Sequence, residues 1–276
     1  MKLTVLVDNK TENAKCQAEW GLSLLIETRG KKILFDTGAS DMFIHNGQAL
    51  GIDLSTVDVA VLSHGHYDHT GGVPSFIEAN DHAKVYLHEN GLKDYYGAEG
   101  GEIDEEPAGI SWSQEFVDFA KATGRLVFTR GRQQLADKVE LIGNIPRLEG
   151  TEATENFYYK TEGGFELDDM SHEQILVVEE DDKLFVFSGC SHIGVLSILE
   201  YVKKLYPGKK IAGFIAGMHL YAYGEKELEE ILVELEKREL SYLVPLHCTG
   251  MMPIMKMKER FGEGCIIAMA GDTYEF

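Results

Sequence analysis

The stretch Ser63-His64-Gly65-His66-Tyr67-Asp68-His69-Thr70-Gly71-Gly72 holds three imidazoles and a carboxylate within six residues. It follows an apolar run that predicts a strand over Val57–Leu62. Side chains alternate along an extended segment, so His64, His66 and Asp68 can point to one side. A turn at Asp68 then brings His69 toward them. Nitrogen and oxygen ligands without thiolates are typical of a catalytic Zn, Fe or Mn site.

Short apolar runs rich in β-branched residues recur on both sides of this stretch and predict two sets of strands. In the first half we expect strands at Leu3–Val7, Leu22–Glu27, Lys32–Phe35, Val57–Leu62 and Lys84–Leu87. In the second half we expect them at Ile175–Glu179, Leu184–Ser188, Ile211–Ile215, Tyr242–Leu246 and Ile266–Ala270. An amphipathic helix is predicted over Glu225–Leu235, and another begins just after His192 and ends near Pro207.

The region from about Asn90 to Gly164 is Gly-rich, acidic and irregular, with strands expected near Arg125–Thr129 and Val139–Ile142. We interpret it as an insertion or lid within one domain that spans residues 1–276, rather than as a second domain. This is an α/β pattern, with strands in both halves and helices between them.

The composition is globular: 276 residues are 44% hydrophobic, and 29 Gly and 6 Pro follow no period, which excludes disordered, collagen-like and coiled-coil classes. The 46 acidic residues exceed the 26 Lys and Arg, giving a net charge of -20. Such a charge disfavours nucleic acid and anionic membranes as partners, although a metal site can still attract a small anionic substrate. Four scattered cysteines without a CxxC pair, and the lack of a signal-like or membrane-spanning run, predict a cytoplasmic location.

His64 to His69 match the signature HxHxDH in full, and in this respect the chain resembles the metallo-β-lactamase superfamily. The resemblance extends upstream to Phe35-Asp36-Thr37-Gly38 and downstream to Pro245-Leu246-His247, and so spans most of the chain. It implies a four-layer αββα sandwich with the metals at one edge between the two sheets. It also implies that Asp36 lies beneath the metal loop and accepts hydrogen bonds that orient the ligand histidines.

The chain more closely resembles a subgroup that includes archaeal 7,8-dihydropterin-6-methyl-4-(β-D-ribofuranosyl)-aminobenzene-5'-phosphate synthases and bacterial metal-dependent hydrolases. The matching motifs are Gly143-Asn144-Ile145-Pro146-Arg147, Asp168-Asp169 followed by Glu173-Gln174, Ser188 to Gly194, Gly217-Met218-His219-Leu220 and His247-Cys248-Thr249-Gly250.

One departure from the wider superfamily concerns the bridging Asp that hydrolytic members carry in a Gly-Asp pair. This chain has Gly189-Cys190-Ser191-His192 there. Either Cys190 occupies the bridging position, or His192, on the same side of an extended segment, supplies the ligand while Cys190 supports it or is a plain buried thiol. We favour His192.

The resemblance therefore implies two divalent ions, with Zn as the default and Fe or Mn as alternatives. One ion is assigned to His64, His66 and His192, and the other to Asp68, His69 and His247. Asp68 is also the candidate catalytic residue, because its carboxylate can orient a nucleophile or shuttle its proton.

Three residues are candidates for contact with substrate. Arg147 can grip a phosphate bidentately, although a lone Arg is more often an ion-pair residue. Thr249 precedes an expected helix, where its hydroxyl and the backbone N–H groups can bind an anion. His219 follows an apolar strand and is expected to contact substrate, with metal ligation as the alternative. His172 is interpreted as a surface or supporting histidine.

Three functions fit these residues. The first, which we favour, is hydrolysis of a small phosphate-bearing or ester substrate by a water that two ions activate. The second is a transferase of the pterin synthase type, in which the ions hold a diphosphate leaving group. The third is a metal-dependent binding protein without catalysis. The sequence leaves the native substrate and the oligomeric state open.

Overall fold

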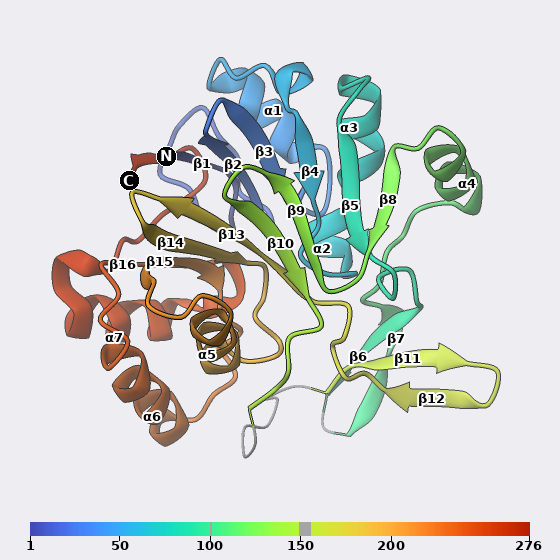
Figure 1. Ribbon diagram of the computed structural model, residues 1–276. Coiled ribbons are helices and arrows are strands. Elements are labelled where there is room, and N and C mark those ends of the chain that lie inside the picture. The colour runs from blue at the N-terminus through green and yellow to red at the C-terminus, as the bar shows by residue number, and fades with distance from the viewer. Residues whose placement is uncertain (100, 149–155) are drawn as a thin grey trace.

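The computed structural model describes residues 1–99, 101–148 and 156–276, and within them the strands form two large mixed sheets and one small sheet (Figure 1). The first sheet contains, in spatial order, β17 (Thr273–Glu275), β1 (Lys2–Val7), β2 (Ser23–Thr28), β3 (Lys31–Phe35), β4 (Val59–Val61), β5 (Lys84–His88) and β8 (Leu126–Thr129). The second contains β16 (Tyr242–Leu246), β15 (Lys210–Gly217), β14 (Lys183–Ser188), β13 (Gln174–Glu180), β10 (Val139–Gly143) and β9 (Arg132–Ala136). The small sheet contains β12 (Gly164–Leu167), β11 (Tyr158–Thr161), β6 (Tyr95–Glu99) and β7 (Glu102–Pro107).

Three hydrophobic clusters show that the two large sheets are stacked with helices on both outer faces. Between the sheets, residues such as Phe35 of β3 pack in one cluster with residues such as Phe187 of β14. The outer face of the first sheet carries α1 (Met42–Ala49), α3 (Val73–Ala79) and α4 (Gln114–Ala122). The outer face of the second carries α5 (Val195–Leu205), α6 (Glu225–Glu236) and α7 (Met251–Phe261). This is the four-layer αββα sandwich that the family resemblance implies.

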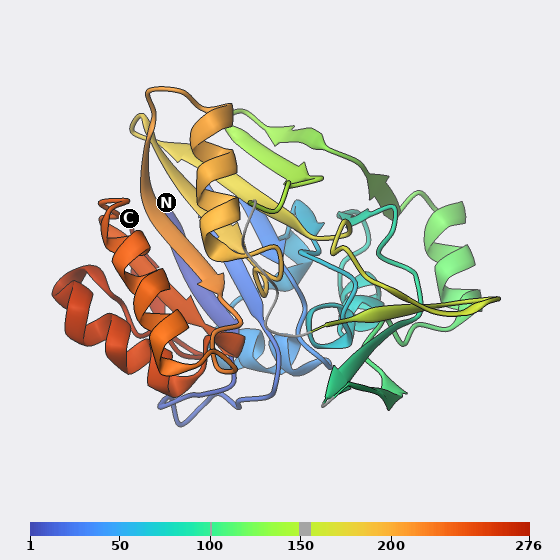
Figure 2. The same cartoon turned by 90° about the horizontal axis from the view of Figure 1, so that it is seen from below.

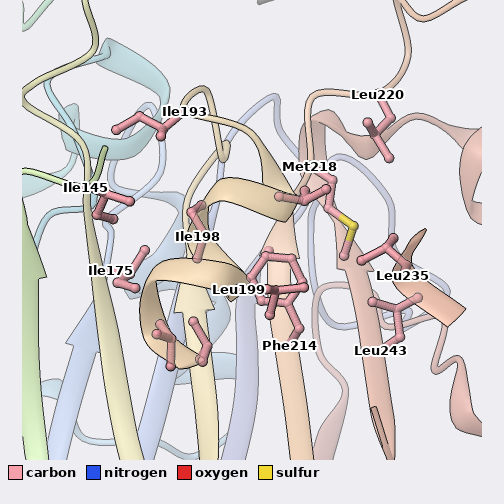
Figure 3. Packing of buried hydrophobic residues seen from close by; sticks show 14 of the residues in the cluster. Ile145, Ile175, Ile193, Ile198, Leu199, Phe214, Met218, Leu220, Leu235 and Leu243 are labelled. Atoms are coloured by element: carbon pink, nitrogen blue, oxygen red, sulfur yellow. The ribbon is translucent and has the colours of Figure 1, made fainter. Parts of the chain in front are cut away.

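Figure 2 shows the stacked layers from below, and Figure 3 shows part of the outer cluster, in which Ile198 and Leu199 of α5 lie over Phe214 of β15. The central strands are continuous apolar runs that are buried on both faces, and because each face must be covered, the two sheets stack with helices outside them. Within the described ranges, no helix combines the length and apolar character needed to cross a membrane.

The functional edge of the sandwich lies where strands of both sheets end. In the first sheet, β3, β4, β5 and β8 are parallel neighbours, and β1 shares their direction because β2 is antiparallel to both β1 and β3. In the second sheet, β14, β15 and β16 are parallel. The segments that leave β1, β3 and β4 therefore meet those that leave β14, β15 and β16 at the carboxyl ends of the strands, where α/β proteins place their sites.

One strand prediction was wrong. The segment Ile266–Ala270 is irregular, and the last strand is instead β17. The backbone N–H of Ile266 donates to Leu243 of the second sheet, whereas that of Gly271 donates to Val5 of the first. The apolar run thus crosses from one sheet to the other and cannot pair continuously with either.

The other predicted strands are present with ends shifted by up to two residues, and the two predicted helices correspond to α5 and α6. The region from Asn90 to Gly164 contributes β8, β9 and β10 to the large sheets and also supplies most of the small sheet. Residue 100 and residues 149–155 of that region lie outside the described residues. The small sheet lies beside α2 (Tyr67–Thr70), because the N–H of Tyr67 donates to Ala108, just after β7 (Figure 1).

Candidate metal centre

The histidine-rich stretch begins as a buried loop after β4 and continues into the single turn of α2, which carries Asp68 and His69. Two glycines allow the loop to lie against its surroundings. A Cβ on Gly65 would collide with the carbonyl oxygen of Gly91, and a Cβ on Gly189 would collide with Ser63 Oγ. The backbone of the first sheet can therefore approach the end of β14 closely enough for side chains from both to share one volume.

The structure brings the expected ligand residues into two groups. Within each group, the ligand atoms all lie within 4.8 Å of one another. One group contains His64, His66 and His192; the other contains Asp68, His69, Cys190 and His247. This is the division that the resemblance implies, with Cys190 added. Cys190 also forms a third group with His192 and His219, so its thiol lies between the two sets.

Asp36 orients two of these histidines from beneath the loop. It follows β3 in a left-handed conformation (φ 59°) and is fully buried. Its Oδ1 accepts the Ser63 N–H at 2.6 Å, and its Oδ2 accepts the Ser63 hydroxyl and the His69 Nδ1–H, both at 2.7 Å. Ser63 Oγ in turn lies 2.9 Å from His64 Nδ1. These bonds hold the Nδ1 protons of His64 and His69 beneath the loop and direct Nε2 of both rings toward the site, where a bound cation would take the place of any Nε2 proton.

The end of β1 performs the same task for His247. Asn9 Oδ1 lies 2.8 Å from His247 Nδ1, and Asp8 Oδ2 accepts the His247 backbone N–H at 2.8 Å. His247 Nε2 then faces Asp68 Oδ2 at 3.1 Å. Asp8 and Asn9 were not predicted as site residues, although the sequence carries a signal for them: polar residues follow β1 directly, just as Asp36 follows β3.

His172 is a buried supporting residue and does not lie on the surface. Its Nδ1 accepts the Gly65 N–H at 2.9 Å, which requires the proton on Nε2, and Nε2 lies 2.9 Å from Asp168 Oδ2. Both ring nitrogens are therefore engaged. The pair fixes the loop between His64 and His66, and this accounts for the Asp168 motif, to which the sequence analysis gave no role.

The start of α5 is fixed by two charged side chains. Glu173 is fully buried, and its two oxygens accept the N–H groups of His192 and Ile193, each at 2.8 Å. Arg147 donates from Nη2 to the His192 carbonyl at 3.0 Å. In the structure Arg147 is thus a partner of the backbone that carries His192.

The expectation that the Thr249 hydroxyl binds an anion is not met by its hydrogen bonds. Thr249 is fully buried, its hydroxyl donates to the Leu246 carbonyl at 2.7 Å, and it accepts the Met218 N–H at 3.1 Å. The side chain ties the turn after β16 to the end of β15. It holds the backbone next to His247 and His219, and its O–H is directed at the Leu246 carbonyl.

Burial and neighbouring groups set the charge state of the ligand residues. Burial, together with the other imidazoles, holds the pKa of His64, His66 and His192 well below the usual value, so these rings are neutral. Burial acts against protonation of His69 as well, but the carboxylates of Asp68 and Asp36 outweigh it and raise its pKa to about 9. Burial would raise the pKa of Asp68, yet the nearby imidazoles outweigh it and leave that pKa below its usual range.

These residues fit divalent metal ions. Among the described residues, Nε2 of His64, His66 and His192 is buried and has no hydrogen-bond partner. Three neutral imidazoles with unsatisfied buried nitrogens directed at one point are costly unless a cation binds there. Beside them, a carboxylate, a thiol and two oriented imidazoles form a second donor set of the kind that Zn, Fe or Mn accepts.

Aromatic side chains from the region 90–164 close one side of the centre. Phe157 packs on His66 and His192, with ring centroids 4.5 and 5.0 Å apart, and Tyr95 stacks on His172 at 4.2 Å. Neither residue was predicted from the sequence, because neither belongs to a motif with polar neighbours at ligand spacing. They lower the local polarity around the first histidine group and shield it from water.

The chain and its fold have counterparts among known proteins. Residues 21–154 match a family model described as the metallo-beta-lactamase superfamily. Uncharacterized protein MJ0448 of Methanocaldococcus jannaschii is 30% identical over 93% of this chain and 94% of that protein. The 7,8-dihydropterin-6-methyl-4-(beta-D-ribofuranosyl)-aminobenzene-5'-phosphate synthase of the same organism is 28% identical over 99% of this chain and 95% of that protein. Tm1679, whose crystal structure is described as that of a metal-dependent hydrolase of the beta-lactamase superfamily, is 29% identical in sequence. The two structures superpose with a TM-score of 0.84 over 100% of this chain and 99% of that chain.

Proposed function

This chain belongs to the metallo-β-lactamase superfamily, and we propose that it is a dinuclear metal-dependent hydrolase of a small phosphate-bearing or ester substrate. The observation that carries the proposal is the pair of buried donor groups, His64, His66 and His192 beside Asp68, His69, Cys190 and His247. The description of Tm1679 as a metal-dependent hydrolase supports the reaction class.

The chain's own residues have separate tasks in such a reaction. When bound, two divalent ions acidify a shared water and stabilise negative charge on a leaving oxygen. Asp68, whose low pKa keeps it a carboxylate, lies with Oδ2 3.1 Å from His247 Nε2 and 3.8 Å from His69 Nε2. From there it accepts the proton of the attacking water or orients that water toward the substrate. Phe157 and Tyr95 exclude bulk water from the side of His66.

A transferase is the second candidate, and one observation favours it. The curated relative that is similar over 99% of this chain is named a synthase of a phosphate-bearing aminobenzene. In such a reaction the same residues hold the departing group while a second organic substrate attacks.

The origin of the product oxygen separates the two candidates. We expect turnover of phosphomonoesters, phosphodiesters or carboxylic esters in ¹⁸O-labelled water to place one labelled oxygen in a product, because water is the nucleophile in hydrolysis. Mass spectrometry of the products measures this. Unlabelled products and an absolute need for a second organic substrate would instead assign the chain to transfer. If zinc-loaded protein catalyses neither hydrolysis nor transfer, the remaining candidate is the metal-dependent binding protein.

We further propose that the Cys190 thiolate is shared between the two metal groups, in the place that a bridging Asp takes in hydrolytic relatives. Cys190 Sγ lies 3.0 Å from His69 Nε2 and belongs to two donor groups. Burial raises the pKa of the thiol, so a cation must displace its proton for it to bind. Cobalt-substituted protein should therefore show a near-ultraviolet thiolate-to-cobalt charge-transfer absorption, and Cys190→Ser should abolish it.

Two matched variants make that result specific. Cys265→Ser changes a buried thiol outside the donor groups and should leave the absorption intact. Cys248→Ser tests the neighbouring thiol, whose Sγ lies 3.8 Å from the Cys190 carbonyl. An absorption that survives Cys190→Ser and disappears in Cys248→Ser would show that Cys248 is the ligand instead.

A further inference from the structure

A cavity of about 460 Å³ adjoins the second donor group and is not used by the chemistry above. Its walls come from three separate places: Trp20 in the segment between β1 and β2, Tyr221 after β15, and Met251 and Ile254 of α7. His247 and Cys248 form the wall toward the metal centre. A group in this cavity therefore lies directly beside the ligand His247.

The cavity walls are aromatic and apolar and are exposed to solvent. Trp20, Tyr221 and Met251 are 49%, 47% and 55% exposed, although large side chains of these types are more often packed. The Trp20 ring meets Tyr221 edge to face at 6.4 Å and His247 at 5.2 Å. A Cβ on Gly250 would collide with Tyr221, so only glycine allows the tyrosine to lie against the start of α7.

The charge of the cavity indicates a neutral occupant. Lys10 is among the lining residues, but its Nζ lies 2.6 Å from the buried carboxylate of Asp8. The Asn9 side chain accepts from His247 and from the Gly21 N–H. These groups can meet one or two heteroatoms, while they supply no net positive charge for a phosphate.

From these observations we propose that the cavity binds a planar aromatic or heteroaromatic ring of the substrate, against Trp20 and Tyr221. This inference rests on the proposed function and adds a substrate class to it: the bond that reacts lies at the donor groups, and the ring that the enzyme selects lies beside His247. Ring edges and faces, together with the polarisable sulfur of Met251, favour a flat π system over a saturated group of similar size.

Calorimetric titration of zinc-loaded protein with 1-naphthyl phosphate, cyclohexyl phosphate and inorganic phosphate tests the proposal. We expect naphthyl phosphate to bind roughly tenfold more tightly than cyclohexyl phosphate. Contacts between aromatic rings can add about a factor of ten in affinity to the gain from the surface area that they bury. Trp20→Leu keeps an apolar wall but removes the ring, and it should remove most of that preference while the affinity for inorganic phosphate stays unchanged. Phe119→Leu, which changes an exposed ring on α4, is the matched control and should keep the preference.

Each alternative outcome has its own signature. Equal affinities for the two organic phosphates, or a preference that Trp20→Leu leaves intact, would overturn the proposal. A doubling of mass in light scattering that Trp20→Leu abolishes would assign the cavity to a second copy of the chain and also overturn it. Titration with 1-naphthol and cyclohexanol after chelation separates this proposal from the metal chemistry. A Trp20-dependent preference for naphthol in protein that never binds metal would support the ring site while the proposed function fails.

Discussion

Replacing His66 by alanine is expected to lower bound metal from two ions per chain to about one, and to reduce hydrolysis about a thousandfold. His66 contributes one of three neutral imidazoles whose buried Nε2 atoms lack partners among the described residues. Two nitrogens without the third hold a divalent ion poorly, because catalytic sites of this kind use at least three protein ligands. Metal ions contribute several kcal/mol to the stabilisation of charge in a transition state, and each 1.36 kcal/mol is about a factor of ten in rate.

Elemental analysis of protein purified without chelator, before and after reconstitution with zinc, measures the stoichiometry. His45→Ala is the matched control, since His45 lies on α1 with its side chain 60% exposed and belongs to neither donor group. It should keep both metal content and turnover. Wild-type metal content and rate in His66→Ala would contradict the assignment of an ion to His64, His66 and His192. Absence of metal from the reconstituted wild-type protein would remove the basis of the proposed function altogether.

The sequence predicted those parts of the centre that are encoded in short stretches. The residues from His64 to His69 lie within one short loop and the helical turn that follows it, so their spacing alone indicates that they meet. The two sets of apolar strands with helices between them indicated an α/β fold, whereas the four-layer αββα arrangement came from the family resemblance. The division of ligands between the two groups came from the resemblance, and the structure brings the same residues together.

Supporting interactions between distant segments could not be read from the sequence. His172 contacts Gly65 across 107 positions, and Asn9 contacts His247 across 238. Nothing in the local pattern of either residue specifies a partner so far along the chain. The roles suggested for Arg147 and Thr249 rested on their chemical type, whereas the structure shows both bound to backbone groups near the ligands. Ile266–Ala270 has the composition of a strand, but the crossing between sheets determines its shape.

Asp36→Asn is expected to weaken metal binding about a hundredfold while leaving the fold intact. A loss of this size is at the upper end of what is typical for mutation of a residue that orients a metal ligand. The amide has the size of the carboxylate, and its oxygen can still accept the Ser63 N–H, which now donates to Oδ1 at 2.6 Å. Its NH₂ group then faces His69 Nδ1, which at present donates to Oδ2 at 2.7 Å. Two donors cannot face each other, so the His69 proton moves to Nε2, the atom that must be unprotonated to bind a cation.

Competition with a chromogenic chelator measures the zinc affinity, and thermal unfolding of the chelated protein measures the fold. Asp41→Asn is the matched control, because Asp41 precedes α1 with its side chain 55% exposed and no hydrogen bond that caps the helix. A lower affinity together with an unchanged unfolding temperature would assign the loss to the position of a proton and not to damaged packing. If Asp36→Asn binds zinc as tightly as the wild type, the carboxylate does not set the tautomer of His69. Asn9 fixes the Nδ1 proton of His247 in the same way, with an amide oxygen rather than a carboxylate. The amide carries no charge, so its part in metal affinity should be smaller than that of Asp36.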